Sequence, residues 1–107
     1  MIVYISGQMT RKDNYKEDFS NAEQWLIKNG YTPINPTRLE VFNLTYEQYM
    51  ILDYELIKMC DGIFMLSGWQ NSKGACAELT FAKSLSKKVI YQDYYKGYRK
   101  SEKRNSN

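Results

Sequence analysis

Two acidic residues fall on helix faces that are otherwise apolar. A helix expected over residues 45–60 carries Asp53 inside its apolar arc when projected at about 100° per residue. A helix expected over residues 74–86 carries Glu78 on its packing face. Because a buried carboxylate without a partner is costly, such residues often mark functional sites. The structural alternatives are a loop-capping carboxylate at the core rim for Asp53 and a helix N-terminal charge for Glu78.

The two carboxylates suit chemistry at a glycosidic bond. Glu78 is expected in the first turn of its helix, where free amides and the helix dipole stabilise an anion and favour a nucleophile. Retaining glycosidic cleavage needs one carboxylate to attack the sugar carbon and another to handle the proton of the leaving group. We therefore interpret Glu78 as the nucleophile and Asp53 as the acid and base. Tyr4, on the first expected strand, is a third candidate that could orient a carboxylate, with core packing as its alternative.

The absence of histidine narrows the chemistry further. Without histidine, Ser–His and Cys–His nucleophile activation and the common zinc sites are excluded. The two cysteines, Cys60 and Cys76, lack the Cys-x-x-Cys spacing of metal or redox sites. We therefore expect no metal and no cofactor, and carboxylates, tyrosine or lysine must carry any acid–base step.

Strand-like and helix-like segments alternate along the chain. Capping-box patterns at Asn14–Glu17 and Thr45–Gln48 predict two helix starts, and Gly30 is placed as a helix end. Such alternation predicts parallel strands joined by right-handed crossovers. We predict one α/β domain over residues 1–95, a three-layer flavodoxin-like (Rossmann-like) fold with about four strands. The expected strands are 2–6, 31–35, 63–67 and 88–92, and the segments 36–44 and 68–73 are expected to be loops.

A ligand site is expected beyond the carboxyl ends of the strands, where the strand order reverses. This places the segment after the first strand beside the segment after the third. The loop before residue 74 runs into a helix N-terminus, a geometry that suits anions such as phosphate, and Lys73 adds a positive charge. For Trp69, stacking on a base or sugar and a role as a hydrophobic lid are equally open. The predicted substrate-binding residues are Ser6, Gly7, Gln8, Met9, Ser67, Gly68, Trp69, Ser72, Lys73 and Gly74.

The net charge of +3 is unevenly distributed along the chain. Residues 96–107 contain five basic residues and one acidic residue, so this segment carries +4 and the remainder −1. A flexible, solvated tail is therefore favoured over nucleic-acid binding. No apolar run reaches the roughly 18 residues of a membrane span, and Met1 leads directly into a strand-like run. We expect a cytoplasmic protein without membrane contact that forms a homo-oligomer, because a small sheet has exposed edges.

Several short motifs together resemble a known family. They are Tyr4-Ile5-Ser6-Gly7-Gln8-Met9, Asn35-Pro36, Cys60-Asp61-Gly62 before a strand, and the segment from Gly68-Trp69 through Ser72-Lys73-Gly74-Ala75-Cys76-Ala77-Glu78. On these residues the chain resembles a family of small phage and bacterial proteins of unassigned function. That family is similar to the nucleoside 2-deoxyribosyltransferases.

The resemblance implies roles for the three candidate catalytic residues. In the transferases the matching glutamate attacks the anomeric carbon to give a glycosyl-enzyme, aspartates contact and protonate the base, and a strand tyrosine positions the glutamate. These roles fall on Glu78, Asp53 and Tyr4. The sequence departs from the transferases where Ser72-Lys73 replaces an acidic pair, and the lysine there favours a phosphorylated ligand. Transferase sites also borrow residues from a neighbouring subunit.

The resemblance leads us to expect cleavage or exchange of an N-glycosidic bond in a nucleoside or nucleoside 5′-monophosphate. The protein would be a transferase or a hydrolase, with another base or water as acceptor. The alternative is a binding module that sequesters a nucleotide or a nucleotide-derived signal without turnover, because the acidic pair is missing. A third interpretation is a small assembly protein that uses its tyrosine-rich surface and basic tail.

Overall fold

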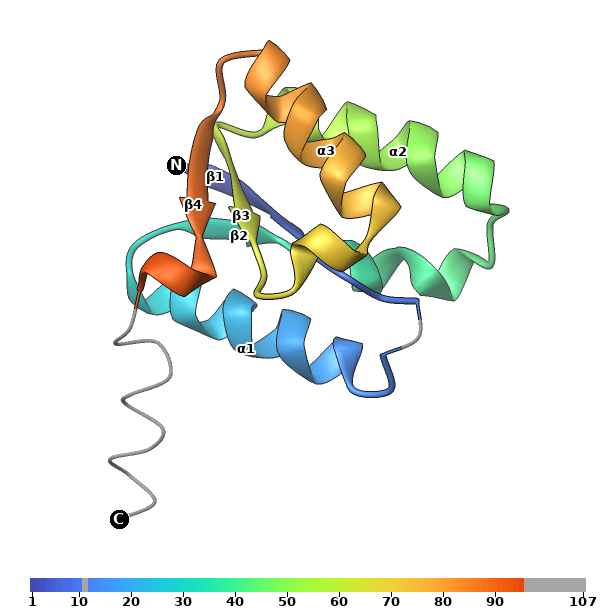
Figure 1. The fold of residues 1–107 in the computed structure, drawn as a ribbon, viewed down its shortest axis with the longest axis horizontal. Coiled ribbons are helices and arrows are strands. Elements are labelled where there is room, and N and C mark those ends of the chain that lie inside the picture. Colours follow the sequence, from blue (N-terminus) through green and yellow to red (C-terminus); the bar gives the residue numbers. More distant parts are fainter. Residues whose placement is uncertain (11, 96–107) are drawn as a thin grey trace.

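A four-stranded parallel sheet forms the centre of the part of the chain that the computed structural model describes, residues 1–10 and 12–95 (Figure 1). The chain runs from β1 outward to β2 and then crosses back to β3, so the strand order reverses between β1 and β3. This is the flavodoxin-like arrangement, and the predicted fold class is confirmed. The basic segment 96–107 lies outside the described residues. The strands are β1 (Ile2–Ser6), β2 (Thr32–Ile34), β3 (Gly62–Met65) and β4 (Lys88–Tyr91), in the order β2-β1-β3-β4.

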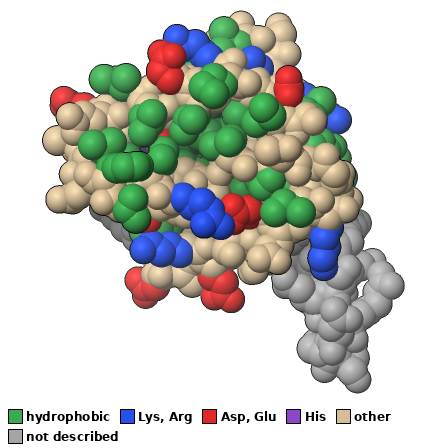
Figure 2. Space-filling view, turned by 180° about the vertical axis from the view of Figure 1, so that it is seen from behind, with side chains coloured by type: hydrophobic (Ala, Val, Ile, Leu, Met, Phe, Trp, Pro, Cys, Tyr) green, Lys and Arg blue, Asp and Glu red, His purple; other side chains and the backbone are tan. Residues whose placement is uncertain are grey.

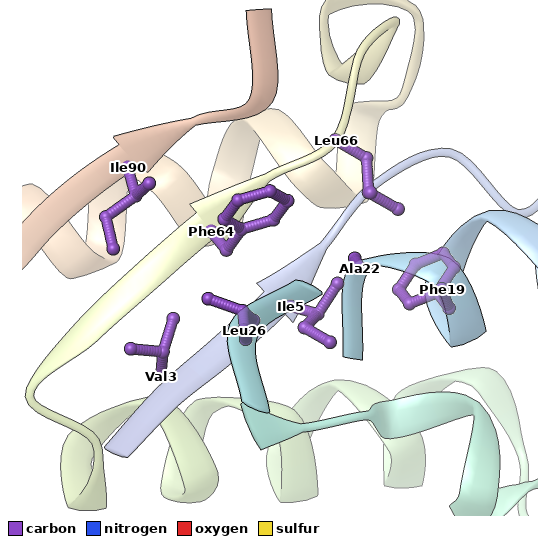
Figure 3. Close-up of a cluster of buried hydrophobic side chains, with 8 residues drawn as sticks. All are labelled: Val3, Ile5, Phe19, Ala22, Leu26, Phe64, Leu66 and Ile90. Carbon is purple, nitrogen blue, oxygen red and sulfur yellow. The ribbon is translucent and has the colours of Figure 1, made fainter. Parts of the chain in front are cut away.

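Helices cover both faces of the sheet, which gives three layers (Figure 1). Successive strand residues point to opposite faces, so Val3 and Ile5 pack on one side of the sheet and Tyr4 packs on the other. The first side is covered by α1 (Tyr15–Lys28), and the second by α2 (Tyr46–Met59) and α3 (Lys73–Ser84). Figure 3 shows the cluster beneath α1, which contains Val3, Ile5, Phe19, Ala22, Leu26, Phe64, Leu66 and Ile90.

Side-chain caps fix the starts of α2 and α3. Thr45 forms the predicted capping box, in which its side chain accepts from the Gln48 N–H and the Gln48 side chain accepts from the Thr45 N–H. Ser72 Oγ accepts from the Ala75 N–H at 3.1 Å, so α3 begins one residue earlier than predicted. The capping box predicted at Asn14 is wrong. Its backbone ψ of 29° is far from the extended conformation that aims a cap side chain at the helix amides.

The segment 36–44, predicted as a loop, contains the 3₁₀ helix η1 (Pro36–Phe42). Asn35 caps η1, because its side-chain oxygen accepts from the Thr37 N–H at 3.1 Å, and Pro36 occupies the first turn. A 3₁₀ helix has about three residues per turn and therefore lacks the pattern that reveals an α-helix. Shorter 3₁₀ helices follow β3 and β4, namely η2 (Trp69–Asn71) and η3 (Gln92–Tyr94).

Large hydrophobic side chains are also exposed at the surface, and Figure 2 shows several of them gathered on one face. Among those of η1 and α2, Val41 is 80% and Ile51 67% exposed. Tyr46, which helix projection placed on the packing arc of α2, is 70% exposed. It is the first residue of α2, whereas the buried residues Asp53 and Ile57 lie further along the helix. No helix in the described part of the chain is long and apolar enough to span a membrane.

Candidate active site

Two hydroxyl groups of β1 hold the carboxylate of Glu78. Tyr4 Oη donates a hydrogen bond to Glu78 Oε2 at 2.9 Å, and Ser6 Oγ donates to Glu78 Oε1 at 2.6 Å. Alternate residues of a strand share a face, so β1 presents both hydroxyls to α3. All three side chains are buried, with Glu78 only 7% exposed. The position of the carboxylate is therefore fixed at both oxygens.

Glu78 lies deeper along its helix than predicted. Because α3 begins at Lys73, Glu78 is in the second turn and not in the first. Free N–H groups and the helix dipole act mainly within the first turn. The hydroxyls of Tyr4 and Ser6, and not the end of the helix, therefore stabilise a negative charge on Glu78.

Asp53 brings a second buried carboxylate to the same place. It belongs to α2 and is 9% exposed. Burial raises the pKa of Asp53 to about 6, while interactions with Tyr4 and Glu78 act in the opposite direction. Burial also raises the pKa of Glu78 to about 7; the hydrogen bond from Ser6 lowers it and the charge of Asp53 raises it. Both carboxyl groups therefore exchange protons near neutral pH, as acid–base chemistry requires.

Tyr4 serves this pair as a neutral donor. Burial raises the pKa of Tyr4 well above its usual value, and the charges of Glu78 and Asp53 raise it further. The phenol therefore keeps its proton at any physiological pH. Its hydroxyl contacts Glu78 and its ring belongs to the core beneath α2 and α3, so both arrangements considered from the sequence are present. A role for Tyr4 in catalysis stays a prediction.

Glu78 and Asp53 both line a cavity of about 580 Å³, a volume typical of small-molecule sites. The walls come from the segment after β1, from η1, from the first half of α2, and from the region where η2 meets α3. The cavity therefore lies beyond the carboxyl ends of β1 and β3, the two strands between which the strand order reverses. The lining residues are Gly7, Gln8, Met9, Thr10, Pro36, Glu40, Tyr46, Tyr49, Met50, Asp53, Asn71, Ser72, Lys73, Gly74, Ala75 and Glu78.

The structure places some of the predicted binding residues on the cavity wall and others elsewhere. Gly7, Gln8 and Met9 line the cavity, as do Ser72, Lys73 and Gly74. Ser6 does not, because its hydroxyl is buried against Glu78, so it positions the carboxylate. Contact of the six lining residues with a substrate stays a prediction.

Ser67, Gly68 and Trp69 lie away from the cavity wall. The Ser67 N–H donates to Gln92 Oε1 at 2.8 Å, and its hydroxyl donates to Asp93, so both groups are turned toward the segment after β4. The Trp69 ring packs toward the ring of Tyr91, with 6.0 Å between their centroids. Gly68 nevertheless lies beside Gln8, as predicted, because a Cβ atom on Gly68 would be 4.0 Å from Gln8 Oε1. Contact of these three residues with a substrate stays a prediction.

The sequence patterns did not predict that η1 and the start of α2 form one wall of the cavity. Tyr49 fastens η1 to α2, since its hydroxyl donates to the Leu39 carbonyl at 3.3 Å and accepts from the Leu44 N–H at 3.2 Å. Glu40 of η1 accepts from the Tyr15 hydroxyl at 2.7 Å. The signal that could have revealed η1 was Asn35-Pro36, a cap followed by proline at the start of a helix. The other lining residues that sequence patterns missed are Thr10, Pro36, Tyr46, Met50, Asn71 and Ala75.

Gly7 allows β1 and β3 to approach closely beside the cavity. A Cβ atom on Gly7 would lie 2.7 Å from Leu66 Cδ1 and 2.8 Å from Leu66 Cβ, distances that real Cβ atoms do not adopt. Any larger residue would therefore displace Leu66 or the segment that follows β1. Glycine here keeps the wall of the cavity in contact with the core beneath α1.

The sheet order and the three layers recur in the solved structures of two enzymes. A 2-deoxyribosyltransferase from Leishmania mexicana matches the structure with a TM-score of 0.67 and 20% identity, over 84% of this chain and 62% of that enzyme. A CMP N-glycosidase from Clostridium botulinum matches with a TM-score of 0.63 and 23% identity, over 89% of this chain and 74% of that enzyme. The chain thus spans less than two thirds of the length of the Leishmania enzyme. At these identities the likeness establishes the fold.

The chain belongs to a family described as a domain of unknown function, DUF4406, whose model matches residues 1–91. No curated protein sequence matches the chain. The resemblance that the sequence motifs indicated is confirmed at the level of fold and family.

Proposed function

We propose that this protein cleaves or exchanges the N-glycosidic bond of a nucleoside or nucleoside 5′-monophosphate, through a covalent glycosyl-enzyme on Glu78. One observation carries the proposal. A buried carboxylate is held at both oxygens by Tyr4 and Ser6, beside the carboxyl group of Asp53, on the wall of a cavity of about 580 Å³. A fixed nucleophile next to a proton donor is the arrangement that retaining glycosidic chemistry uses.

The reaction divides into two displacements at the anomeric carbon. In the first, the Glu78 carboxylate forms a bond to this carbon while the bond to the base nitrogen breaks, and the base takes the proton of Asp53. In the second, water or another base attacks the same carbon, Asp53 accepts the proton that is released, and the ester to Glu78 breaks. Water gives hydrolysis and a base gives transfer. The names of the two similar enzymes, a deoxyribosyltransferase and a CMP N-glycosidase, support these two outcomes.

The start of α3 supports a phosphorylated substrate. Lys73 and Asn71 line the cavity beside the first turn of the helix, where the positive end of the helix dipole favours an anion. The absence of an acidic side chain in this turn leaves its positive character uncompensated. A 5′-monophosphate would therefore bind with its phosphate toward α3.

The proposal predicts a covalent adduct. A substrate analogue with an electron-withdrawing group at the second carbon of the sugar should slow both displacements and allow the ester to accumulate. Intact-protein mass spectrometry should show the added sugar, and peptide mapping should place it on Glu78. Glu78→Gln should give no adduct and no turnover but should still bind the ligand.

A matched variant separates this outcome from a general loss of structure. Glu17→Gln changes an exposed residue of α1 outside the cavity, so it should form the adduct as the unmodified protein does. An adduct on another residue, or full activity of Glu78→Gln, would contradict the role of Glu78.

A sequestering module is the second candidate function. It is favoured by the contact that Ser72 makes, because Ser72 occupies a position of the missing acidic pair. The Ser72 hydroxyl caps α3 by accepting from the Ala75 N–H, and a hydroxyl cannot replace the carboxylate that an acidic residue would offer to a base. Nucleotide binding without turnover or adduct, measured on the same protein sample, would select this candidate.

We also propose that the protein forms a homo-oligomer. Support comes from the exposed hydrophobic side chains of η1 and α2, among them Val41, Phe42 and Ile51. Tyr46, which is itself exposed, also lines the cavity, so this surface continues to the mouth of the site. A neighbouring subunit would remove these side chains from water.

A further inference from the structure

The hydroxyl of Ser6 makes one hydrogen bond within residues 1–10 and 12–95, and the acceptor is Glu78. The distance from Ser6 Oγ to Glu78 Oε1 is 2.6 Å, in the short range that is typical of a hydroxyl bound to a charged carboxylate. Ser6 is 1% exposed and does not line the cavity, so its hydroxyl cannot reach a substrate. This hydroxyl therefore acts on the reaction only through Glu78.

Tyr4, the second donor to Glu78, is shared between two carboxyl groups. Its hydroxyl lies 2.9 Å from Glu78 Oε2. Burial raises the pKa of Tyr4, and Glu78 and Asp53 each add to that rise, so the phenol faces both groups. A phenol has one proton to donate. When Asp53 is charged, the two carboxylates compete for Tyr4, whereas the Ser6 hydroxyl donates to Glu78.

The charge on Glu78 changes during the two displacements. It is complete in the free protein, falls as the carboxylate bonds to the anomeric carbon, and is absent in the ester. In the second displacement water or a base bonds to this carbon, the ester bond breaks, and its electron pair returns to Glu78 while Asp53 accepts the proton. A donor to Glu78 therefore binds most strongly in the free protein, less strongly in the transition state and least strongly in the ester. Such a donor opposes formation of the ester and favours its breakdown.

We propose that Ser6 is a positioning residue whose hydrogen bond speeds the breakdown of the glycosyl-enzyme, because it stabilises the carboxylate that departs from the sugar. This inference rests on the proposed function, since it requires the ester on Glu78. Asp53 must be charged in the second displacement to accept a proton, so Tyr4 is divided between two carboxylates at that step. Ser6 then remains as the donor to Glu78, whichever carboxylate oxygen carried the sugar.

The lifetime of the trapped ester tests the proposal. The protein is labelled with the analogue that carries an electron-withdrawing group at the second carbon of the sugar, and excess analogue is removed. Intact-protein mass spectrometry then follows the loss of the added sugar at constant pH. The ester on Ser6→Ala should decay at least about 10-fold more slowly than on the unmodified protein, the lower range for a hydrogen bond to a charged group.

Two further variants separate the hydroxyl from the packing of Ser6. Ser6→Thr keeps a hydroxyl and should restore the faster decay. Ser20→Ala removes an exposed serine of α1 outside the cavity, so its ester should decay as it does on the unmodified protein. A loss of packing alone would loosen Glu78 and reduce labelling without lengthening the life of the ester.

The outcomes distinguish this inference from the proposed function. Equal decay of the ester on Ser6→Ala and on the unmodified protein would overturn the role of Ser6 and leave Glu78 as the nucleophile. Failure of Ser6→Ala to form the ester would also overturn it, because the hydroxyl should oppose formation. No ester on the unmodified protein would overturn the proposed function and this inference together. If Ser6→Ala does not fold, Ser6→Cys takes its place, and its ester should also decay slowly because a thiol is a weak donor.

Discussion

At the scale of single residues, burial governs the chemistry that we propose. The pKa of Asp53 is raised to about 6 and that of Glu78 to about 7. Because the two groups interact, these values describe the titration of the pair. The productive state has Glu78 charged and Asp53 protonated, so the pair then holds one proton.

Turnover should depend on pH in a bell shape with its maximum between about pH 6 and 7. Below this window Glu78 is protonated and cannot attack, and above it Asp53 has lost the proton that the base needs. Asp53→Asn should reduce kcat by roughly 10²–10⁴-fold and remove the fall on the alkaline side. Steady-state kinetics between pH 4 and pH 9 provide the check, with thermal unfolding to confirm that the variant is folded. An unchanged profile would remove Asp53 from the mechanism.

The same burial should make the free energy of unfolding depend on the protonation of Glu78, with the charged form destabilising the folded protein. Its pKa in the folded protein, about 7, lies above the ordinary 4.5, so the folded state binds the proton more tightly. The resulting stabilisation is complete below about pH 4.5 and is lost as pH rises toward 7. Glu78→Gln does not titrate, so its stability relative to the unmodified protein should rise across this window, by roughly 1–3 kcal/mol. Urea unfolding at pH 4.5 and pH 8 measures the difference. Equal pH dependence of the two proteins would argue that Glu78 is not destabilised by burial.

The sequence was sufficient to find the two buried carboxylates. It was not sufficient to find residues whose contacts depend on where the side chain points. Helix projection located Glu78 and Asp53, because a carboxylate on an apolar face is visible in the periodicity. The hydrogen bond from Ser6 to Glu78 could not be predicted, because the sequence does not show where the hydroxyl of a strand serine points. Glu40 was missed for a different reason, because its segment has no 3.6-residue period.

At the scale of elements, β1 and η1 determine the geometry of the site. β1 is an inner strand of the sheet and carries both hydroxyls that hold Glu78. η1 is attached through Tyr15 of α1 and through Tyr49 of α2, so one wall of the cavity depends on two helices. The strands and α-helices could be predicted because strand runs and amphipathic periods are strong signals. The attachment of η1 could not, since side-chain contacts between distant segments leave no local pattern.

The first turn of α3 should discriminate between a nucleotide and its nucleoside. Lys73→Ala should weaken a 5′-monophosphate roughly 10- to 100-fold more than the matching nucleoside, because the side chain contributes a charge-assisted contact to phosphate only. Calorimetric affinities of both ligands give the ratio. Lys83→Ala, in the last turn of the same helix, serves as the control for charge alone. Equal weakening of both ligands would exclude a phosphate at this place.

At the scale of the whole molecule, the exposed apolar surface of η1 and α2 should mediate self-association. Sedimentation velocity at micromolar concentration should show a dimer or a larger species. Ile51→Lys should shift it toward the monomer, because a charge at a buried contact is costly. Ile27→Lys is the control, since Ile27 is 59% exposed on α1, on the other side of the sheet. A monomeric unmodified protein would contradict the proposal.

The reversal of strand order also divides the protein into two halves of different chemistry. Residues 1–44 supply β1, β2 and α1 and bring the hydroxyls of Tyr4 and Ser6, whereas residues 45–95 supply β3, β4, α2 and α3 and bring Asp53 and Glu78. The two halves meet where β1 pairs with β3, and the cavity takes residues from both. The two donors and the Glu78 carboxylate come together through hydrogen bonds that span 74 and 72 positions of sequence. During synthesis the proposed nucleophile should thus stay unsupported by its two hydroxyl donors until α3 has docked on β1.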